Sequence, residues 1–162
     1  MAVDLTLAKQ HLRLDTSDED TLVAAYLAAA KAWVESYTGK LLTRREVAQP
    51  ETRFGAFITL QFGPAPENVE ITYSDGGDDQ TITDARIVRD RLYPLSSWPI
   101  LISPAMIVVN YLAGFDETPS DLDAAVLLLT GDFYANREAG SATPAVTMAV
   151  EALCRPYRPV TV

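Results

Sequence analysis

The chain has 162 residues, and its 13 Lys and Arg side chains against 22 Asp and Glu side chains give a formal net charge of −9. Apolar residues make up 48% of the sequence, which is ordinary for a globular protein and too high for a disordered acidic segment. Recognition of nucleic acid or of an anionic membrane depends on clustered Lys and Arg. The composition therefore argues against both of these partner classes.

Cysteine and histidine each occur once, as Cys154 and His11. A single cysteine excludes an intramolecular disulfide and a Cys-rich zinc site, and a single histidine leaves only one candidate base for a catalytic triad. Neither a phosphate-binding glycine motif nor a G-x-S-x-G elbow occurs. We therefore expect no catalytic residue, no cofactor and no metal, and we expect both Cys154 and His11 to be structural.

Residues 1–42 predict two helices. The first has Thr6 as its expected N-cap. The second opens with a capping-box pattern from Ser17 to Asp20 and ends at Gly39. The apolar positions of the second helix recur at helical spacing, and they are Leu22, Ala25, Tyr26, Ala29, Ala30, Trp33, Val34 and Tyr37.

Residues 43–114 hold most of the Gly and Pro and alternate between apolar and polar side chains. This pattern predicts strands at 43–48, 57–62, 69–74, 81–88 and 107–112. Between two of these runs lies the sequence DGGD at 75–78, which favours a hairpin because its glycines permit positive φ. The prolines between the runs indicate short or edge strands.

Residues 115–158 predict two more helices. The third opens with Ser120 as N-cap, is apolar on every side over 124–129, and runs to about Glu138, so we expect it to be the central buried helix. Its apolar run is far shorter than the roughly 18 residues that span a bilayer, and no membrane segment is expected. The fourth runs from near Pro144 toward Arg155, and Pro156 then leaves an exposed tail over 156–162.

Four groups of side chains allow both a structural and a functional interpretation. The acids Asp15, Asp18, Glu19 and Asp20 suit a helix N-terminus, or an acidic docking or lumen-facing patch. The group Tyr134, Arg137 and Glu138 suits a helix C-terminus with an ion pair, or a contact with a neighbouring subunit. The tail residues Arg155, Tyr157 and Arg158 suit a docking peptide or simple disorder, and Asp75, Asp78 and Asp79 suit a polar hairpin tip or a cation site.

Six segments follow one another along nearly the whole chain: LTLAKQHLRLD, SDED, VESYTGKLL, VVNYLAGF, DETPSDLDAAVLLLTGDFYANREA and VEALCRPYRPV. Taken in that order, they resemble the head–tail connector (adaptor, or head-completion) family of long-tailed bacteriophages and gene transfer agents. This resemblance implies an α+β fold in one connector domain over 1–162. In that domain a small antiparallel-type bundle of about four helices, from 1–42 and 115–158, carries a β-rich insertion at 43–114.

The resemblance implies a structural protein of the virion neck that is made in the bacterial host cytoplasm. Its expected partners are the portal protein, further copies of itself in a ring of about a dozen, and a downstream neck or tail-completion protein. DNA would pass through the ring without sequence-specific binding, past acidic walls that repel phosphate. Arg155, Tyr157 and Arg158 are the residues expected to dock on the portal.

Two other interpretations stay open. One is a tail-completion or tail-terminator ring protein, a class that tends toward mixed sheets without two flanking helical blocks. The other is a small metal-dependent hydrolase that uses His11 or the acidic loop 75–79.

Overall fold

The computed structural model describes residues 3–74, 78–101, 106–137 and 144–158. Within these ranges it has four α-helices and seven strands, and the strands form two antiparallel sheets, so the α+β class is confirmed. The chain divides into two compact units. One is a helical unit, Met1–Thr43 with Asp116–Val162, and the other is a strand unit, Arg44–Phe115. The assignment of one connector domain over 1–162 stays a prediction.

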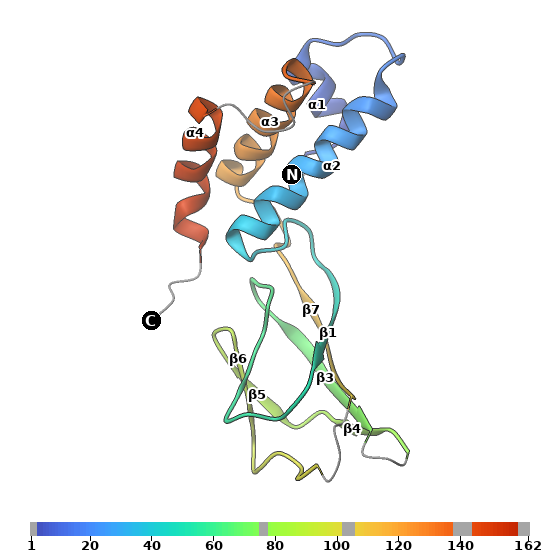
Figure 1. Ribbon diagram of the computed structural model, residues 1–162, viewed down its shortest axis with the longest axis vertical. Coiled ribbons are helices and arrows are strands. Elements are labelled where there is room, and N and C mark those ends of the chain that lie inside the picture. The colour runs from blue at the N-terminus through green and yellow to red at the C-terminus, as the bar shows by residue number, and fades with distance from the viewer. Residues whose placement is uncertain (1–2, 75–77, 102–105, 138–143, 159–162) are drawn as a thin grey trace. The chain divides into compact units, whose positions relative to one another are not determined.

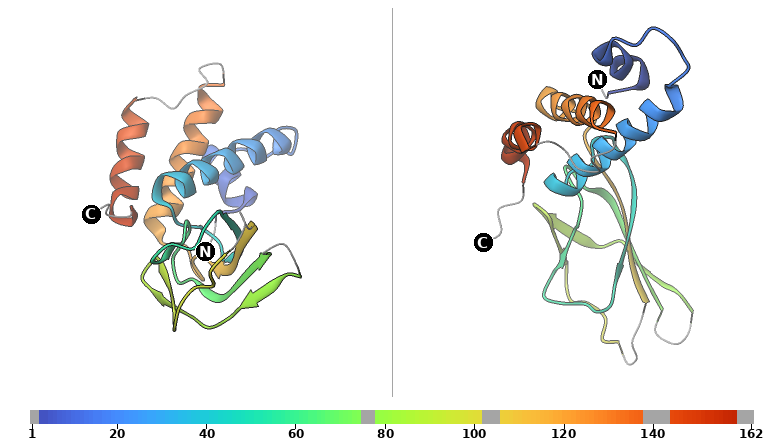
Figure 2. Two further views of the ribbon diagram at one scale, coloured as in Figure 1. Left: turned by 60° about the horizontal axis from the view of Figure 1, so that its bottom comes forward. Right: turned by 45° about the horizontal axis from the view of Figure 1, so that its top comes forward.

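The helical unit is arranged around α3 (Ser120–Ala135), which contacts α1 (Leu5–Leu12), α2 (Asp20–Thr38) and α4 (Pro144–Cys154). Figures 1 and 2 show α3 between α2 and α4. The expectation of a central helix is therefore confirmed. Its burial is one-sided, however, because Leu128 is 36% exposed. The fully buried apolar residues of α3 recur at helical spacing, and they are Leu122, Ala125, Val126 and Leu129.

Both N-terminal helices begin with caps that differ from the expected ones. The cap of α1 is Asp4 instead of Thr6, and the Asp4 carboxylate accepts a hydrogen bond of 2.8 Å from a backbone N–H of the first turn. The cap of α2 is Glu19 instead of Ser17, and its side chain makes no capping bond. The end of α2 is as expected, because Gly39 follows it with φ 64°.

The buried face of α2 is rotated from the expected stripe. Ala25 and Ala29, which the pattern assigned to the core, are exposed. Because alanines lie on both sides of this helix, the larger Val and Leu side chains decide which side packs. The buried residues are Val23, Leu27, Ala30, Val34 and Thr38.

The larger sheet of the strand unit has the order β1-β7-β3-β4, and β7 is one of its two inner strands. The β3–β4 pair, with Ile71 opposite Ile82, confirms the predicted hairpin, while residues 75–77 of its turn lie outside the described residues. The strands are β1 (Arg45–Glu51), β3 (Glu67–Ser74), β4 (Gln80–Ile82) and β7 (Met106–Ala113).

The smaller sheet has the order β2-β6-β5 and differs most from expectation. The run 81–88, expected as one strand, is divided between β4 of the larger sheet and β5 (Ala85–Val88) of this one. The sequence pattern missed β6 (Arg91–Pro94), which pairs with β5 and with β2 (Ile58–Thr59). Figure 1 shows β5 and β6 beside each other, apart from β1, β3 and β7.

A buried glutamine joins the two sheets. Gln49 of β1 is 1% exposed, and its Oε1 accepts hydrogen bonds from the backbone N–H of Gln61 at 2.9 Å and from the hydroxyl of Tyr111 at 3.3 Å. Its Nε2 donates to the carbonyl of Thr59 at 2.8 Å and to the carboxylate of Glu51 at 2.7 Å. The inner side of the larger sheet therefore faces β2, and a polar network lies within the otherwise apolar interior of the strand unit.

Candidate functional site

Two groups that the sequence analysis treated separately meet in the helical unit. Tyr134 near the end of α3 donates its hydroxyl hydrogen to the carboxylate of Glu19 at the start of α2. Arg137 donates from Nη2 to the same carboxylate at 2.7 Å, and its guanidinium lies 4.4 Å from the centre of the Tyr134 ring. Arg137 also donates from Nε to the Tyr134 carbonyl at 3.3 Å, which satisfies a C-terminal carbonyl of the helix.

The electrostatics of this cluster keep Glu19 charged. The Tyr134 hydroxyl, followed by the Arg137 guanidinium, lowers the pKa of Glu19 below its usual value. The hydrogen bond to the Glu19 carboxylate holds the phenol proton and raises the pKa of Tyr134, and the bond from Arg137 to the same carboxylate raises the pKa of Arg137. The cluster fastens the start of α2 to the end of α3, and Glu138, the third residue of the expected group, lies outside the described residues.

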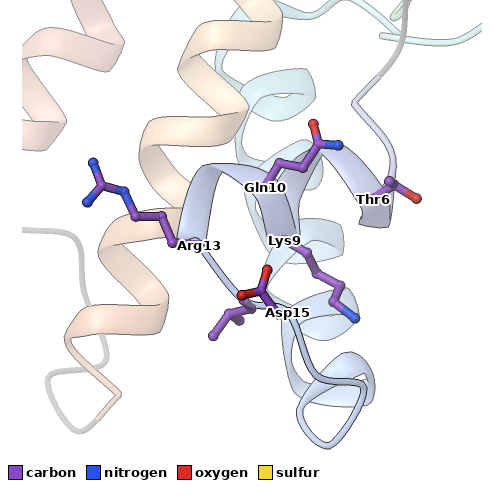
Figure 3. A pocket seen from close by; sticks show the side chains of 6 residues that line it. Thr6, Lys9, Gln10, Arg13 and Asp15 are labelled. Atoms are coloured by element: carbon purple, nitrogen blue, oxygen red, sulfur yellow. The ribbon is translucent and has the colours of Figure 1, made fainter.

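The remaining acids of the expected patch have different environments. Asp20 forms an ion pair of 2.5 Å with Lys9 of α1, so it joins two helices, while Asp15 and Asp18 are exposed. A hollow of about 520 Å³ beside Asp15 is lined by Lys9 and Arg13 of the α1 segment. Figure 3 shows that the side chains of Lys9 and Arg13 point away from each other, so they do not converge on one ligand.

The C-terminal candidates are more ordered than the sequence suggested. An exposed tail was expected from Pro156 onward, but a 3₁₀ turn, η1 (Arg155–Tyr157), follows α4 directly. Proline ends an α-helix yet fits the first positions of such a turn. The Tyr157 hydroxyl donates to Asp121 at 3.5 Å, and the guanidinium of Arg158 lies 4.8 Å from the ring centre of Tyr37. Arg155 is exposed, and residues 159–162 lie outside the described residues.

The residues considered for an enzymatic role do not form a site among the described residues. His11 is exposed and lies against Gly131, while Asp78 and Asp79 are exposed and Asp75 is not described. Cys154 is fully buried, as expected, and burial raises the pKa of its thiol to about 11, which suppresses the reactive thiolate. The described ranges hold no group of three or more His, Cys, Asp or Glu residues that could bind a metal ion. They also hold no helix that is long and apolar enough to cross a membrane.

One set of surface residues was missed by the sequence reasoning. Arg86, Arg89 and Arg91 are exposed on the β5–β6 hairpin, and they follow one another closely in the sequence RIVRDR. The spacing of these arginines was a visible signal. The sequence pattern did not predict β6, so Arg86 and Arg91 could not be placed on one face of a hairpin.

Comparison with known proteins identifies the class of protein to which this architecture belongs. The family model of the Phage gp6-like head-tail connector protein matches residues 2–83, which is just over half of the chain. The chain therefore belongs to the Phage gp6-like head-tail connector family, and the resemblance noted from its motifs is confirmed.

Solved structures from particle necks share the fold over nearly the whole chain. A chain in the neck of an empty GTA particle, computed with C6 symmetry, is 28% identical with a TM-score of 0.83, over 99% of this chain and 91% of that chain. A chain in the virion of a native gene transfer agent (GTA) particle is 29% identical with a TM-score of 0.81, over the same shares. A chain in the neck of a native GTA particle, computed with C12 symmetry, is 28% identical with a TM-score of 0.76, over 100% and 94%. Among curated protein sequences, none matches.

Proposed function

We propose that this protein is a non-enzymatic head–tail connector that forms a ring in the virion neck and extends the DNA channel from the portal toward the tail. The observation that carries this proposal is the likeness to a GTA neck chain over 99% of this chain at 28% identity. That likeness includes both units, which supports assigning the β-rich insertion to the connector together with the helices. The four helices α1 to α4 also disfavour a tail-terminator protein built mainly of sheet.

The ring is supported by the symmetry of the related particles. Necks with similar chains were computed with C6 and C12 symmetry, which suits about a dozen copies around one axis. A closed ring of identical subunits uses two different, complementary faces of each subunit. In this proposal the four helices form the small bundle of such a connector, and DNA passes through the centre without base-specific contacts.

The C-terminal residues supply the proposed portal contact. Arg155 and Arg158 are exposed cations, and the stacking of Arg158 on Tyr37 together with the bond from Tyr157 to Asp121 holds this segment on the helical unit. A segment that is ordered before binding loses less conformational entropy on docking. We assign Arg155, Tyr157 and Arg158 to the portal, and the exposed carboxylates of Asp15 and Asp18 to a surface that repels DNA phosphate.

The test is electron microscopy of the purified protein mixed with a portal ring of the same particle. The expected result is an added ring of density on one end of the portal, and a protein that never binds the portal in any form would overturn the proposal. Deleting residues 156–162 should abolish docking, whereas Arg13→Ala, which removes an exposed cation elsewhere in the helical unit, should leave it unchanged. Full portal binding by the shortened chain would refute the proposal that the C-terminal segment contacts the portal.

A further inference from the structure

The outward side of the β5–β6 hairpin is basic, although the protein as a whole is acidic. Leu92 of β6 is fully buried and pairs with Ile87, so the residues on either side of this pair point away from the interior of the strand unit. Val88 lies opposite Arg91 on that outward side and is 42% exposed. The arginine face, as we call it, consists of Arg86, Val88, Arg91 and Tyr93, and Arg89 lies in the turn between the two strands.

Neither cation of the arginine face, Arg86 or Arg91, forms an ion pair with another residue in the described part of the chain. The guanidinium of Arg91 lies 4.4 Å from the ring centre of Phe57, and that ring lies 5.7 Å from the ring of Tyr93. A guanidinium stacked in this way keeps its charge and its N–H donors available at its edges. Arginine beside aromatic rings is also the composition that is enriched in protein–protein interfaces.

The outward side of the larger sheet carries the opposite charge. The register places Glu46 opposite Leu112 and Glu70 opposite Asn110, on the side of the sheet away from the buried Tyr111. The glutamate face consists of Glu46, Asn68, Glu70, Asn110 and Leu112, which line a shallow hollow of about 530 Å³. Both glutamates are exposed, and neither pairs with a cation among the residues described.

The two faces point in different directions from the same unit. The bond from Gln49 to the carbonyl of Thr59 shows that the inner side of the larger sheet meets the smaller sheet. When two sheets pack by their inner sides, their outer sides lie on opposite surfaces of the pair. One copy therefore presents a basic face on one side and an acidic face on the other.

We propose that the arginine face of one copy binds the glutamate face of the next copy in the ring, an inference that rests on the proposed function. Two copies with a net charge of −9 each repel one another, and a contact that sets Arg86 and Arg91 against Glu46 and Glu70 opposes that repulsion where the copies touch. Val88 and Tyr93 then cover the apolar surface of Leu112. Repeating one such contact from copy to copy closes a head-to-tail ring.

The experiment exchanges the charges of the two faces and measures ring formation on the portal by electron microscopy. R86E/R91E and E46R/E70R each place like charges across the contact, and each should weaken assembly about tenfold or more. The chain that carries all four substitutions restores opposite charges at every contact and should assemble again. R13E/R53E is the matched control for R86E/R91E, because it makes the same change in net charge at exposed arginines outside both faces.

Five outcomes decide between the alternatives. Rescue by the fourfold exchange, with both double variants defective, supports the contact. Rings formed normally by R86E/R91E would overturn it, and so would a fourfold variant that folds by circular dichroism yet fails to assemble. Loss of binding to double-stranded DNA by R86E/R91E, with normal rings, would assign the arginine face to phosphate instead. A wild-type chain that forms no ring at all would instead refute the proposed function.

Discussion

Inside its helices the helical unit satisfies its buried hydroxyls locally, whereas the buried glutamine of the strand unit bonds to segments far apart in the sequence. In the helical unit, the hydroxyls of Thr38 and Thr130 each donate at 2.7 Å to the carbonyl one turn earlier in the same helix. In the strand unit, the side chain of Gln49 bonds to groups that lie as far as 62 positions away in the sequence. Local bonds form as soon as the helix forms, whereas the Gln49 network exists only when three segments are assembled.

This difference indicates which kind of substitution should destabilise each unit. The helical unit depends on the volume that its apolar side chains fill around α3, and the buried hydroxyls within its helices add little. The strand unit depends on a polar group whose loss would leave several partners without a bond. The following substitutions separate these two kinds of dependence.

The largest expected effect is the loss of a core side chain from α3. Leu129 is 1% exposed, so Leu129→Ala removes buried apolar surface and leaves a cavity, and we expect a loss of about 3 kcal/mol in the free energy of unfolding. Leu128→Ala, at an adjacent position that is 36% exposed, is the matched control and should cost about 1 kcal/mol or less. Urea denaturation followed by circular dichroism measures both, and equal losses would contradict one-sided burial of α3.

The next effect tests the polar network directly. Gln49→Leu keeps most of the volume but leaves the backbone N–H of Gln61 and the carbonyl of Thr59 without this partner, so we expect a loss of about 2 kcal/mol. In the helical unit, Thr130→Val removes a hydroxyl whose acceptor carbonyl also belongs to the helix ladder, and it should cost less than about 1 kcal/mol. If Thr130→Val lost as much stability as Gln49→Leu, the two units would not differ in how strongly they depend on buried polar groups.

The same contrast explains what the sequence could predict of the fold. Helix positions, the central place of α3 and the burial of Cys154 follow from periodicity over neighbouring residues, and they were found. The β3–β4 hairpin was found because its turn is local. Strand β6 was missed because Arg91–Pro94 lacks the alternation of β-branched residues, and its pairing with β2 depends on segments about 30 positions apart.

The candidate site in the helical unit could be predicted only in part, because its contacts also join segments far apart in the sequence. The residue types of the helical cluster were identified, but not the pairing of Glu19 with Tyr134 and Arg137, which are 115 and 118 positions away. Such a pairing depends on how α2 packs against α3, and the alanines on both sides of α2 leave that orientation open in the sequence. The 3₁₀ turn at Arg155–Tyr157 was missed because proline was taken to end all helical structure.

A smaller effect concerns the acid stability of the helical unit. The contacts with Tyr134 and Arg137 depress the pKa of Glu19 in the folded state, so the stabilisation is present above the ordinary value of 4.5 and is lost as pH falls through the depressed pKa. We expect Glu19→Gln to lower the Tm at neutral pH and to flatten the decline of Tm between about pH 5 and pH 3.

The measurement for Glu19 is thermal unfolding over that pH range. Asp18→Asn removes a neighbouring exposed carboxylate and is the control, since its loss should leave the slope of Tm against pH close to that of the wild type. Identical slopes for wild type and Glu19→Gln would show that the cluster with Tyr134 and Arg137 does not hold the start of α2 to the end of α3 in solution.

The smallest expected effect tests whether local helix propensity governs the helical unit. Gly131 lies inside α3, and alanine there should stabilise the helix by up to about 1 kcal/mol. The added Cβ would lie 3.3 Å from Nε2 of His11, so the exposed imidazole must shift slightly, and we expect a net gain of about 0.5 kcal/mol for Gly131→Ala. A His11→Ala chain lacks the imidazole that the added Cβ would meet. In that chain Gly131→Ala should stabilise the protein by close to the full gain expected from helix propensity. Urea denaturation of the four chains gives this cycle, and a loss of stability in both backgrounds would mean that packing around α3, rather than its local propensity, sets the stability of this unit.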